Sequence, residues 1–329
     1  MDDVHHMRRA INLAESVRDT TTPNPWVGCV IVPSDDPIVA FEGTTAPPGG
    51  PHAEIVALTQ AGARARGATL FTTLEPCVHQ GRTPPCTAAI VEAGVARVVI
   101  GLEDPDPQVA GRGIAALRAG GLEVTVGVAA DAVGEQLAPY LKHRTTGQPW
   151  VILKLAASFD ARTAAPDGSS HWITGPDARQ DVHRLRARSD AVLVGAGTVR
   201  ADDPALTVRL ADRSSEAQPL RVVLGTAPPD ARVQPALELS GDLGEVLREL
   251  GRRGVLQLLV EGGARVAHDF HAAGLVDRYV IYLAPALFGG DDGRPLFSGT
   301  GAGTIDDVWR GKLVSVERLG DDLRVELAA

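Results

Sequence analysis

Cysteine is scarce in this chain of 329 residues, which contains only Cys29, Cys77 and Cys86. So small and odd a number excludes a disulfide-held scaffold and suits a reducing compartment, so we expect a cytoplasmic protein. The N-terminal stretch 1–6 is acidic and lacks the apolar segment of a signal peptide. No apolar run approaches the length of a membrane span, which argues against a membrane protein.

Aromatic side chains and positive charge are also in short supply. Aromatic residues make up 4% of the chain, so aliphatic and alanine side chains must fill the cores. The chain has 32 Lys and Arg against 41 Asp and Glu, a net charge of −9. Because a long nucleic acid needs a basic face, this balance favours a free small molecule as the partner. The length and the ordinary hydrophobic fraction of 44% fit two globular domains.

The first half of the chain alternates helical patterns with short apolar runs, which predicts a layered α/β domain. Val4, Met7, Ile11, Ala14 and Val17 mark one face of a first helix, with Asp2 or Asp3 as its cap. We expect buried strands over residues 28–32, 69–74, 95–102 and 123–128.

The second half repeats this alternation and predicts another α/β domain. A turn-rich connector over residues 142–149 separates the halves, so we expect domains at 1–146 and 147–329. Helices are expected over residues 176–187 and 264–272, and strands over 150–155, 191–194, 220–224, 255–260 and 278–283, with two more around a turn at 320–322.

His52, Cys77 and Cys86 have the residue types and spacing of zinc ligands, and Glu54 lies beside them. A structural zinc site has four protein ligands, whereas three ligands leave one position open for water, whose pKa zinc lowers. Glu54 is then the candidate acid/base that takes a proton from water and delivers it to a leaving amine. A surface histidine and buried packing cysteines are the alternative, which we disfavour for the whole set. Cys29 is expected to be a buried strand residue rather than a fourth ligand.

The order His-x-Glu, Pro-Cys and Cys is typical of zinc deaminases, which replace an exocyclic amine on a heterocycle with oxygen. In the second half, the loop 195–200 after an expected strand indicates a dinucleotide site only weakly, because Arg200 breaks the strict glycine fingerprint. Glu261-Gly262-Gly263 before an expected helix is better evidence, since paired glycines let backbone amides approach a phosphate. A simple glycine turn remains the alternative.

Three segments of the first half, 22–32, 51–54 and 73–86, resemble the bifunctional riboflavin-biosynthesis deaminase-reductase family. That family joins a cytidine-deaminase-like domain to a dihydrofolate-reductase-like domain. The resemblance implies that Asn24 contacts the pyrimidine and that His79 belongs to a loop that encloses it. Without the resemblance, Asn24 would be a turn residue and His79 an exposed loop histidine.

Segments 154–160, 172–174, 201–209 and 260–263 resemble the reductase motifs of the same family. The resemblance implies that NADPH is bound by Ala156, Trp172, Thr198, Asp202, Thr226, Gly263, Ala264 and Arg265. It implies that the substrate is bound by Ser170, Arg186, Leu206, Arg209 and Glu261. Arginines suit a substrate with a ribose phosphate, although an isolated arginine is usually a surface charge. Lys154 either anchors a substrate oxygen or phosphate or faces solvent at a strand edge.

The chain departs from the family pattern in three places. Thr45 stands where the family often has histidine, so one substrate contact is altered. Ala161 stands where glycine is common, which affects a tight turn. Residues 231–244 are short and turn-like where the family usually has a strand, so we expect a narrower sheet.

We therefore hypothesise a two-step riboflavin-biosynthesis enzyme that uses Zn²⁺ and NADPH. It would deaminate diaminohydroxyphosphoribosylaminopyrimidine and then reduce 5-amino-6-(5-phosphoribosylamino)uracil to its ribityl form. The family suggests a homo-oligomer. One alternative is a deaminase of cytidine or transfer-RNA adenosine with a degenerate or repurposed second domain. Another is a binding protein with structural zinc, against which Glu54 argues, since such a site needs no acid/base.

Overall fold

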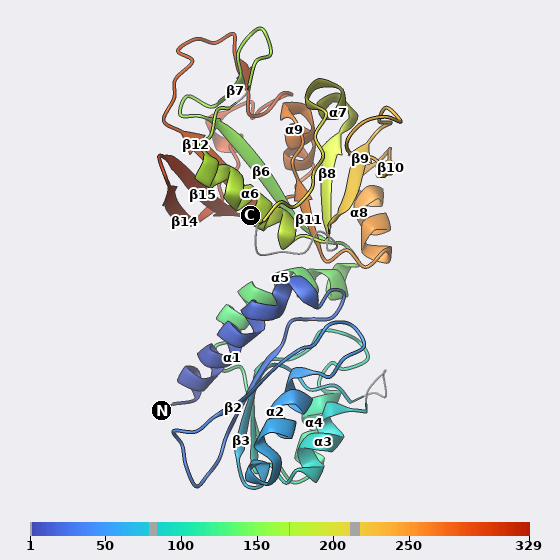
Figure 1. Cartoon of the computed structure of the whole chain (residues 1–329), viewed down its shortest axis with the longest axis vertical. Coiled ribbons are helices and arrows are strands. Elements are labelled where there is room, and N and C mark those ends of the chain that lie inside the picture. The colour runs from blue at the N-terminus through green and yellow to red at the C-terminus, as the bar shows by residue number, and fades with distance from the viewer. Residues whose placement is uncertain (1, 79–83, 171, 211–217) are drawn as a thin grey trace. The chain divides into compact units, whose positions relative to one another are not determined.

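The chain folds into two compact units, Met1–Gly147 and Gln148–Ala329, shown in the computed structural model of Figure 1. The structure describes residues 2–78, 84–170, 172–210 and 218–329. Among these residues no helix is both long and apolar enough to cross a membrane. Each unit is a mixed α/β sheet covered by helices, so the predicted fold class is confirmed.

The first unit is built on a five-stranded sheet in the order β2-β1-β3-β4-β5. β1 runs antiparallel to β2 and β3, whereas β3, β4 and β5 are parallel. The strands are β1 (Gly28–Val32), β2 (Phe41–Thr44), β3 (Thr69–Leu74), β4 (Arg97–Leu102) and β5 (Glu123–Val126).

Helices cover both faces of this sheet. α1 and α5 contact each other and pack on one face, and α2, α3 and α4 lie together on the other (Figure 1). The helices are α1 (Asp3–Val17), α2 (Ala53–Ala61), α3 (Cys86–Glu92), α4 (Arg112–Ala119) and α5 (Ala130–Thr146). A Cβ atom at Gly28 would lie 1.9 Å from the Ala10 carbonyl oxygen, so only glycine lets α1 come this close to β1.

One expectation for the first unit needs correction, and one strand was not predicted. The connector predicted over 142–149 is helical as far as Thr146, and the Thr145 and Thr146 hydroxyls donate to carbonyls of the preceding turn. Gly147, with φ of 71°, then ends the helix. The strand β2 was not predicted, since Phe41–Thr44 has little apolar character.

The second unit is built on an eight-stranded sheet in the order β10-β9-β8-β11-β6-β12-β15-β14. β15 runs antiparallel to β12 and β14, and the other neighbours are parallel. The strands are β6 (Trp150–Ser158), β8 (Ala191–Gly195), β9 (Leu220–Leu224), β10 (Leu237–Leu239), β11 (Gln257–Val260), β12 (Arg278–Ala284), β14 (Lys312–Leu319) and β15 (Asp322–Ala328), and a separate pair is formed by β7 (Arg162–Ala164) and β13 (Arg294–Pro295).

Two apolar clusters hold helices on either face of the larger sheet. One cluster joins the strands to α8 and α9, and the other joins them to α6 and α7. The helices are α6 (Pro176–Ala187), α7 (Ala196–Asp202), α8 (Leu243–Arg252) and α9 (Ala264–Ala272).

Residues 231–244 contain the strand β10, so the prediction that no strand lies there was wrong. Leu237 and Leu239 pack against the apolar cluster while Glu238 points away, and the three residues pair in parallel with β9. Three residues with one alternation are too short for a clear sequence pattern. The alternative that Lys154 faces solvent at a strand edge was also wrong, because β6 lies between β11 and β12.

Candidate active sites

His52, Cys77 and Cys86 come together at the N-termini of two helices in the first unit. His52 immediately precedes α2, and Cys86 is the first residue of α3. Their ligating atoms lie within 4.8 Å of one another, with His52 Nδ1 at 3.2 Å from Cys86 Sγ and 3.6 Å from Cys77 Sγ. Cys29 is fully buried on β1 and does not belong to this group.

These separations fit a zinc ion. Ligands of a tetrahedral zinc, at about 2.3 Å for sulfur and about 2.0 Å for nitrogen, lie ~3.5 Å apart. A hydrogen bond from Cys86 lowers the pKa of Cys77 to about 4, and the same bond raises the pKa of Cys86. Two thiols in contact therefore compete for one negative charge, a competition that a divalent cation removes.

Glu54 lies in the first turn of α2 and its side chain enters the same pocket. The residue is only 4% exposed, and burial raises the pKa of its carboxyl group. A buried carboxyl group that holds a proton more tightly than usual is suited to take up and release protons near neutral pH.

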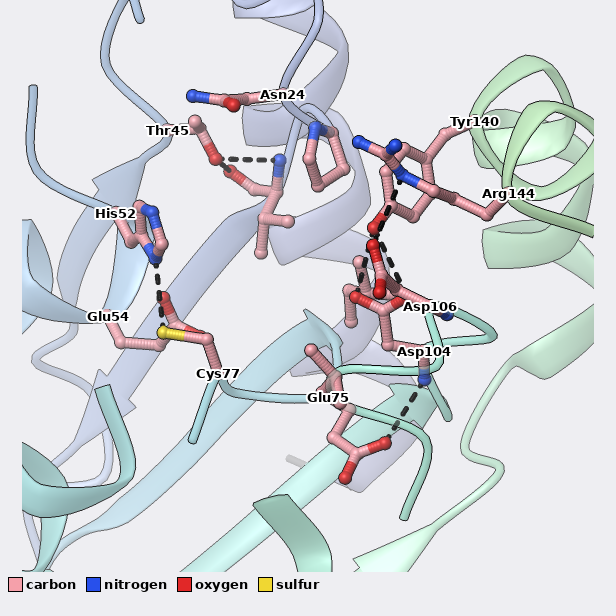
Figure 2. A pocket seen from close by; sticks show the side chains of 14 residues that line it. Asn24, Thr45, His52, Glu54, Glu75, Cys77, Asp104, Asp106, Tyr140 and Arg144 are labelled. Atoms are coloured by element: carbon pink, nitrogen blue, oxygen red, sulfur yellow. Dashed lines mark hydrogen bonds and ion pairs between the residues drawn. The ribbon is translucent and has the colours of Figure 1, made fainter. Parts of the chain in front are cut away.

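Asn24 and Thr45 line the pocket near His52 (Figure 2). The Asn24 backbone N–H donates to the Thr21 carbonyl, which fixes the turn that carries the side chain. The Thr45 hydroxyl accepts a hydrogen bond from the Val27 N–H at 3.0 Å. His79 was also predicted here, but it lies outside the described residues.

The opposite wall of the pocket was not predicted. It comes from the loop after β4 and from α5, and consists of Asp104, Asp106, Tyr140 and Arg144 (Figure 2). The Tyr140 hydroxyl donates to the Asp104 carboxylate, with both oxygens at 3.1 Å. Burial raises the pKa of Asp104 to about 6. The position of Asp104 after a parallel strand was a usable signal, because ligands often bind beyond such strand ends.

A larger pocket of about 550 Å³ lies in the second unit. All six substrate residues predicted for this unit line it: Lys154, Ser170, Arg186, Leu206, Arg209 and Glu261. Of the residues predicted for the cofactor, Ala156, Trp172, Thr198 and Asp202 line it as well. The pocket therefore brings together residues from distant parts of the sequence that the resemblance had assigned separately.

The remaining predicted cofactor residues are not among those that line this pocket. Gly263 adjoins it, because its backbone N–H donates to the Thr198 hydroxyl at 3.1 Å. Ala264 opens α9, and Thr226 follows β9. Arg265 is exposed and pairs with Asp269 on its own helix. Their cofactor contacts stay predictions.

Charged groups dominate the centre of the larger pocket. Arg186 and Glu261 form an ion pair, and burial lowers the pKa of Lys154 while Glu261 opposes that shift. His183, which was not predicted, lines the pocket and accepts a hydrogen bond at Nδ1 from the Arg209 N–H at 3.3 Å. Arg179 and Arg232 add two further cations to the lining.

Comparison with known families gives one match in each half. Residues 1–102 match the cytidine and deoxycytidylate deaminase zinc-binding region, and residues 149–325 match the RibD C-terminal domain. The chain is 46% identical to the riboflavin biosynthesis protein RibD of Mycobacterium tuberculosis (strain H37Rv), over 98% of this chain and 96% of that protein. It is 40% identical to RibD of Escherichia coli K12, over 99% of each.

Solved structures agree with these matches. Acinetobacter baumannii RibD superposes with a TM-score of 0.93 at 40% identity, covering 99% of this chain and 98% of that one. A diaminohydroxyphosphoribosylaminopyrimidine deaminase/5-amino-6-(5-phosphoribosylamino)uracil reductase from Thermotoga maritima superposes with a TM-score of 0.87 at 35% identity, with the same coverage. The similarity thus extends through both units.

Proposed function

Because the chain belongs to the RibD family of bifunctional riboflavin-biosynthesis enzymes, we propose that residues 1–146 carry the deaminase and residues 147–329 the reductase. Zinc and NADPH are the cofactors of these two activities. The observation that carries the first assignment is that Glu54 shares one pocket with His52 and Cys77, with Cys86 beside them. The alternative of a deaminase with a degenerate second half is not favoured, since the match to the RibD C-terminal domain spans residues 149–325.

In the deaminase pocket His52, Cys77 and Cys86 would hold the zinc ion. When bound, zinc lowers the pKa of a water ligand. Glu54 would accept a proton from water and pass it to the amine that leaves the pyrimidine of diaminohydroxyphosphoribosylaminopyrimidine. Asn24 would orient the ring, because its side-chain amide offers both a donor and acceptor beside Glu54.

In the reductase pocket, the cationic residues would hold the ribose phosphate of 5-amino-6-(5-phosphoribosylamino)uracil. Arg186 and Arg209 offer planar donor groups that suit a phosphate or sugar oxygens. Thr198, with the Gly263 N–H bonded to its hydroxyl, would position NADPH from the side of α7 and α9. The protein orients nicotinamide against substrate here, and the hydride chemistry belongs to the cofactor.

The test supplies the pyrimidine substrate to the whole protein with and without NADPH, and follows ammonia release and NADPH oxidation. Glu54→Gln should lower ammonia release by at least ~100-fold, retain bound zinc, and leave reduction of separately supplied deaminated substrate unchanged. Ammonia release that persists in Glu54→Gln would overturn the role of Glu54. Deamination without any NADPH oxidation would overturn the assignment of the second half.

We also propose that the protein assembles from copies of itself through β14. This strand ends the larger sheet, and Leu313, Val314 and Val316 are 58%, 44% and 54% exposed. An apolar edge strand pairs readily with another strand. Antiparallel pairing of two copies places Lys312 opposite Glu317 when Leu313 faces Val316. Light scattering should detect the assembly, and the pair Val314→Lys and Val316→Lys should dissociate it.

The cellular setting is proposed on simpler grounds. The three cysteines are unpaired, which supports a reducing cytoplasm. The net charge of −9 supports small-molecule substrates over nucleic acid. Fractionation of cells and a filter-binding assay with RNA test these two proposals separately.

A further inference from the structure

Trp172 lines the larger pocket of the second unit, although 71% of this residue is exposed. The resemblance assigns Trp172 to NADPH, and a flat indole ring suits stacking against a planar ring of a cofactor. A ring that is already held in the right orientation binds its ligand at a lower entropic cost than one that must first be ordered. The contacts of the segment 172–175 therefore bear directly on the affinity for NADPH.

Arg179, on α6, contacts this segment at two points. Its guanidinium carbon lies over the Trp172 ring, 4.6 Å from the ring centre, which is a cation–π contact. Its Nη1 donates a hydrogen bond to the Thr174 carbonyl oxygen at 2.6 Å. Because one guanidinium group makes both contacts, it restricts the rotation of the ring and the displacement of the backbone together.

Asp322, the first residue of β15, holds the other end of the segment. It is only 2% exposed, and its Oδ2 accepts a hydrogen bond from the Gly175 N–H at 2.7 Å. Gly175 is the N-cap of α6, and in a capping box its N–H would bond to the side chain at the third helical position. That position is Ala178, which has no acceptor, so a strand 147 residues further along the chain supplies the carboxylate instead.

The helix and the strand that supply these contacts are also fastened to each other (Figure 1). Asp181 of α6 lies 2.8 Å from Arg324 Nε of β15 and accepts a hydrogen bond from the Tyr282 hydroxyl at 2.6 Å. The side chains of Asp181 and Arg324 are largely buried, at 16% and 12% exposed. The segment 172–175 is thus held by two elements that keep a fixed position relative to each other.

We propose that Arg179 and Asp322 are positioning residues, which hold Trp172 in the orientation in which its ring stacks on NADPH. Asp322 is not among the described residues that line the pocket, so it acts through the segment 172–175 rather than by touching the cofactor. The inference rests on the proposed function. It adds that the affinity for NADPH depends on a residue at the start of β15, outside the cofactor site.

The experiment measures NADPH affinity and reductase kinetics in the whole zinc-loaded protein. Asp322→Ala should raise the Kd for NADPH, measured by calorimetric titration, and the KM for NADPH by about 3- to 10-fold, since one buried hydrogen bond is lost. The KM for 5-amino-6-(5-phosphoribosylamino)uracil should change less than about twofold. Asp322→Asn keeps an acceptor for the Gly175 N–H and should restore NADPH binding to within about twofold of wild type.

Asp277→Ala is the matched control. It removes a carboxylate that accepts a hydrogen bond of the same length, 2.7 Å, from the Val151 N–H of β6, away from the described pocket lining. The variant should lower stability in urea, as Asp322→Ala does, but leave the Kd for NADPH within about twofold of wild type. An equal rise of Kd in both variants would show that weaker binding reports a general loss of stability, and the proposal would be wrong.

A double variant tests whether the positioning residues act through the ring. Trp172→Ala should itself weaken NADPH binding. Asp322→Ala/Trp172→Ala should then bind NADPH within about twofold as tightly as Trp172→Ala alone, because no ring remains to be positioned. Losses that multiply in the double variant would overturn the proposal.

If urea unfolding shows that Asp322→Ala has no folded second unit, Arg179→Met takes the same test, alone and combined with Trp172→Ala. Methionine keeps an apolar stem but makes neither contact of the guanidinium group, so a 3- to 10-fold rise of Kd is expected here as well, by about the same hydrogen-bond contribution. NADPH binding that neither Asp322→Ala nor Arg179→Met weakens would contradict this inference alone. Wild-type protein that binds no NADPH would instead contradict the proposed function.

Discussion

Arg186 and Glu261 form a two-bond ion pair inside the larger pocket of the second unit. Arg186 Nε lies 2.6 Å from Glu261 Oε1, and Nη2 lies 3.0 Å from Oε2. Only 13% and 8% of the two side chains are exposed. Because Lys154 adds a second cation beside the same carboxylate, Glu261 balances the charge of both.

We predict that Arg186→Met destabilises the second unit and abolishes reduction. Removing one partner leaves Glu261 buried with less compensation, which costs about 3 kcal/mol. Urea unfolding should show this loss, while ammonia release by the first unit stays within about twofold of wild type.

The double variant Arg186→Met/Glu261→Gln tests whether the loss of stability comes from the ion pair or from the other contacts of the two residues. If the two residues act as a pair, the loss of unfolding free energy in the double variant will be smaller than the sum of the two single losses by about 1–3 kcal/mol. Simple additivity would show that the ion pair does not account for the loss.

Much of the fold could be predicted where local signals mark both ends of an element. The helices 176–187 and 264–272 have the predicted bounds, because Pro176 suits a first helical position and paired glycines precede Ala264. β10 could not be predicted, since its short alternation gains meaning only against β9 and the apolar cluster.

The residues of the candidate sites also fall into two groups: those that local sequence signals mark, and those that only the folded chain brings together. His52, Glu54 and Cys86 lie at helix starts and Cys77 follows β3, and their spacing is readable in the sequence. Arg144 was missed because an arginine near a helix end looks like a surface charge, and α5 meets the loop after β4 only in three dimensions.

Cys77 and Cys29 should differ in their effect on zinc. Cys77→Ala removes a ligand, so bound zinc should fall from about one ion per chain to near zero, with loss of deamination. Cys29→Ala, the matched control, removes a buried thiol outside the ligand group and should keep zinc while lowering stability by about 1 kcal/mol. Metal analysis of both proteins measures this, and zinc loss in Cys29→Ala would contradict the ligand set.

Ala161 holds a backbone conformation that favours glycine, as the departure from the family pattern suggested. Its φ is 62°, and its N–H donates to the Ser158 carbonyl in a tight turn. Ala161→Gly should raise the free energy of unfolding by about 0.5 kcal/mol, since relief of strain exceeds the added chain entropy. Ala157→Gly, on the neighbouring buried strand, should lower it by about 1 kcal/mol. Thermal melts should therefore shift in opposite directions.

Asp104 should make the stability of the first unit depend on pH. Burial raises the pKa of its carboxyl group from 3.8 to about 6, with smaller contributions from nearby Asp106 and Glu75. A raised carboxyl pKa means that the folded state favours the proton, so this stabilisation is complete below about pH 4 and is lost as pH rises through about 6. The asparagine side chain in Asp104→Asn cannot ionise, and its carbonyl oxygen can still accept the hydrogen bond from Tyr140.

The difference in unfolding free energy between Asp104→Asn and wild type should thus move in favour of the variant by about 1–3 kcal/mol between pH 4.5 and pH 8. Urea unfolding at both pH values measures that change, whatever the cost of the substitution itself. A difference that stays constant would mean that Asp104 is ionised throughout, with the Tyr140 and Asp106 hydrogen bonds offsetting the cost of burial.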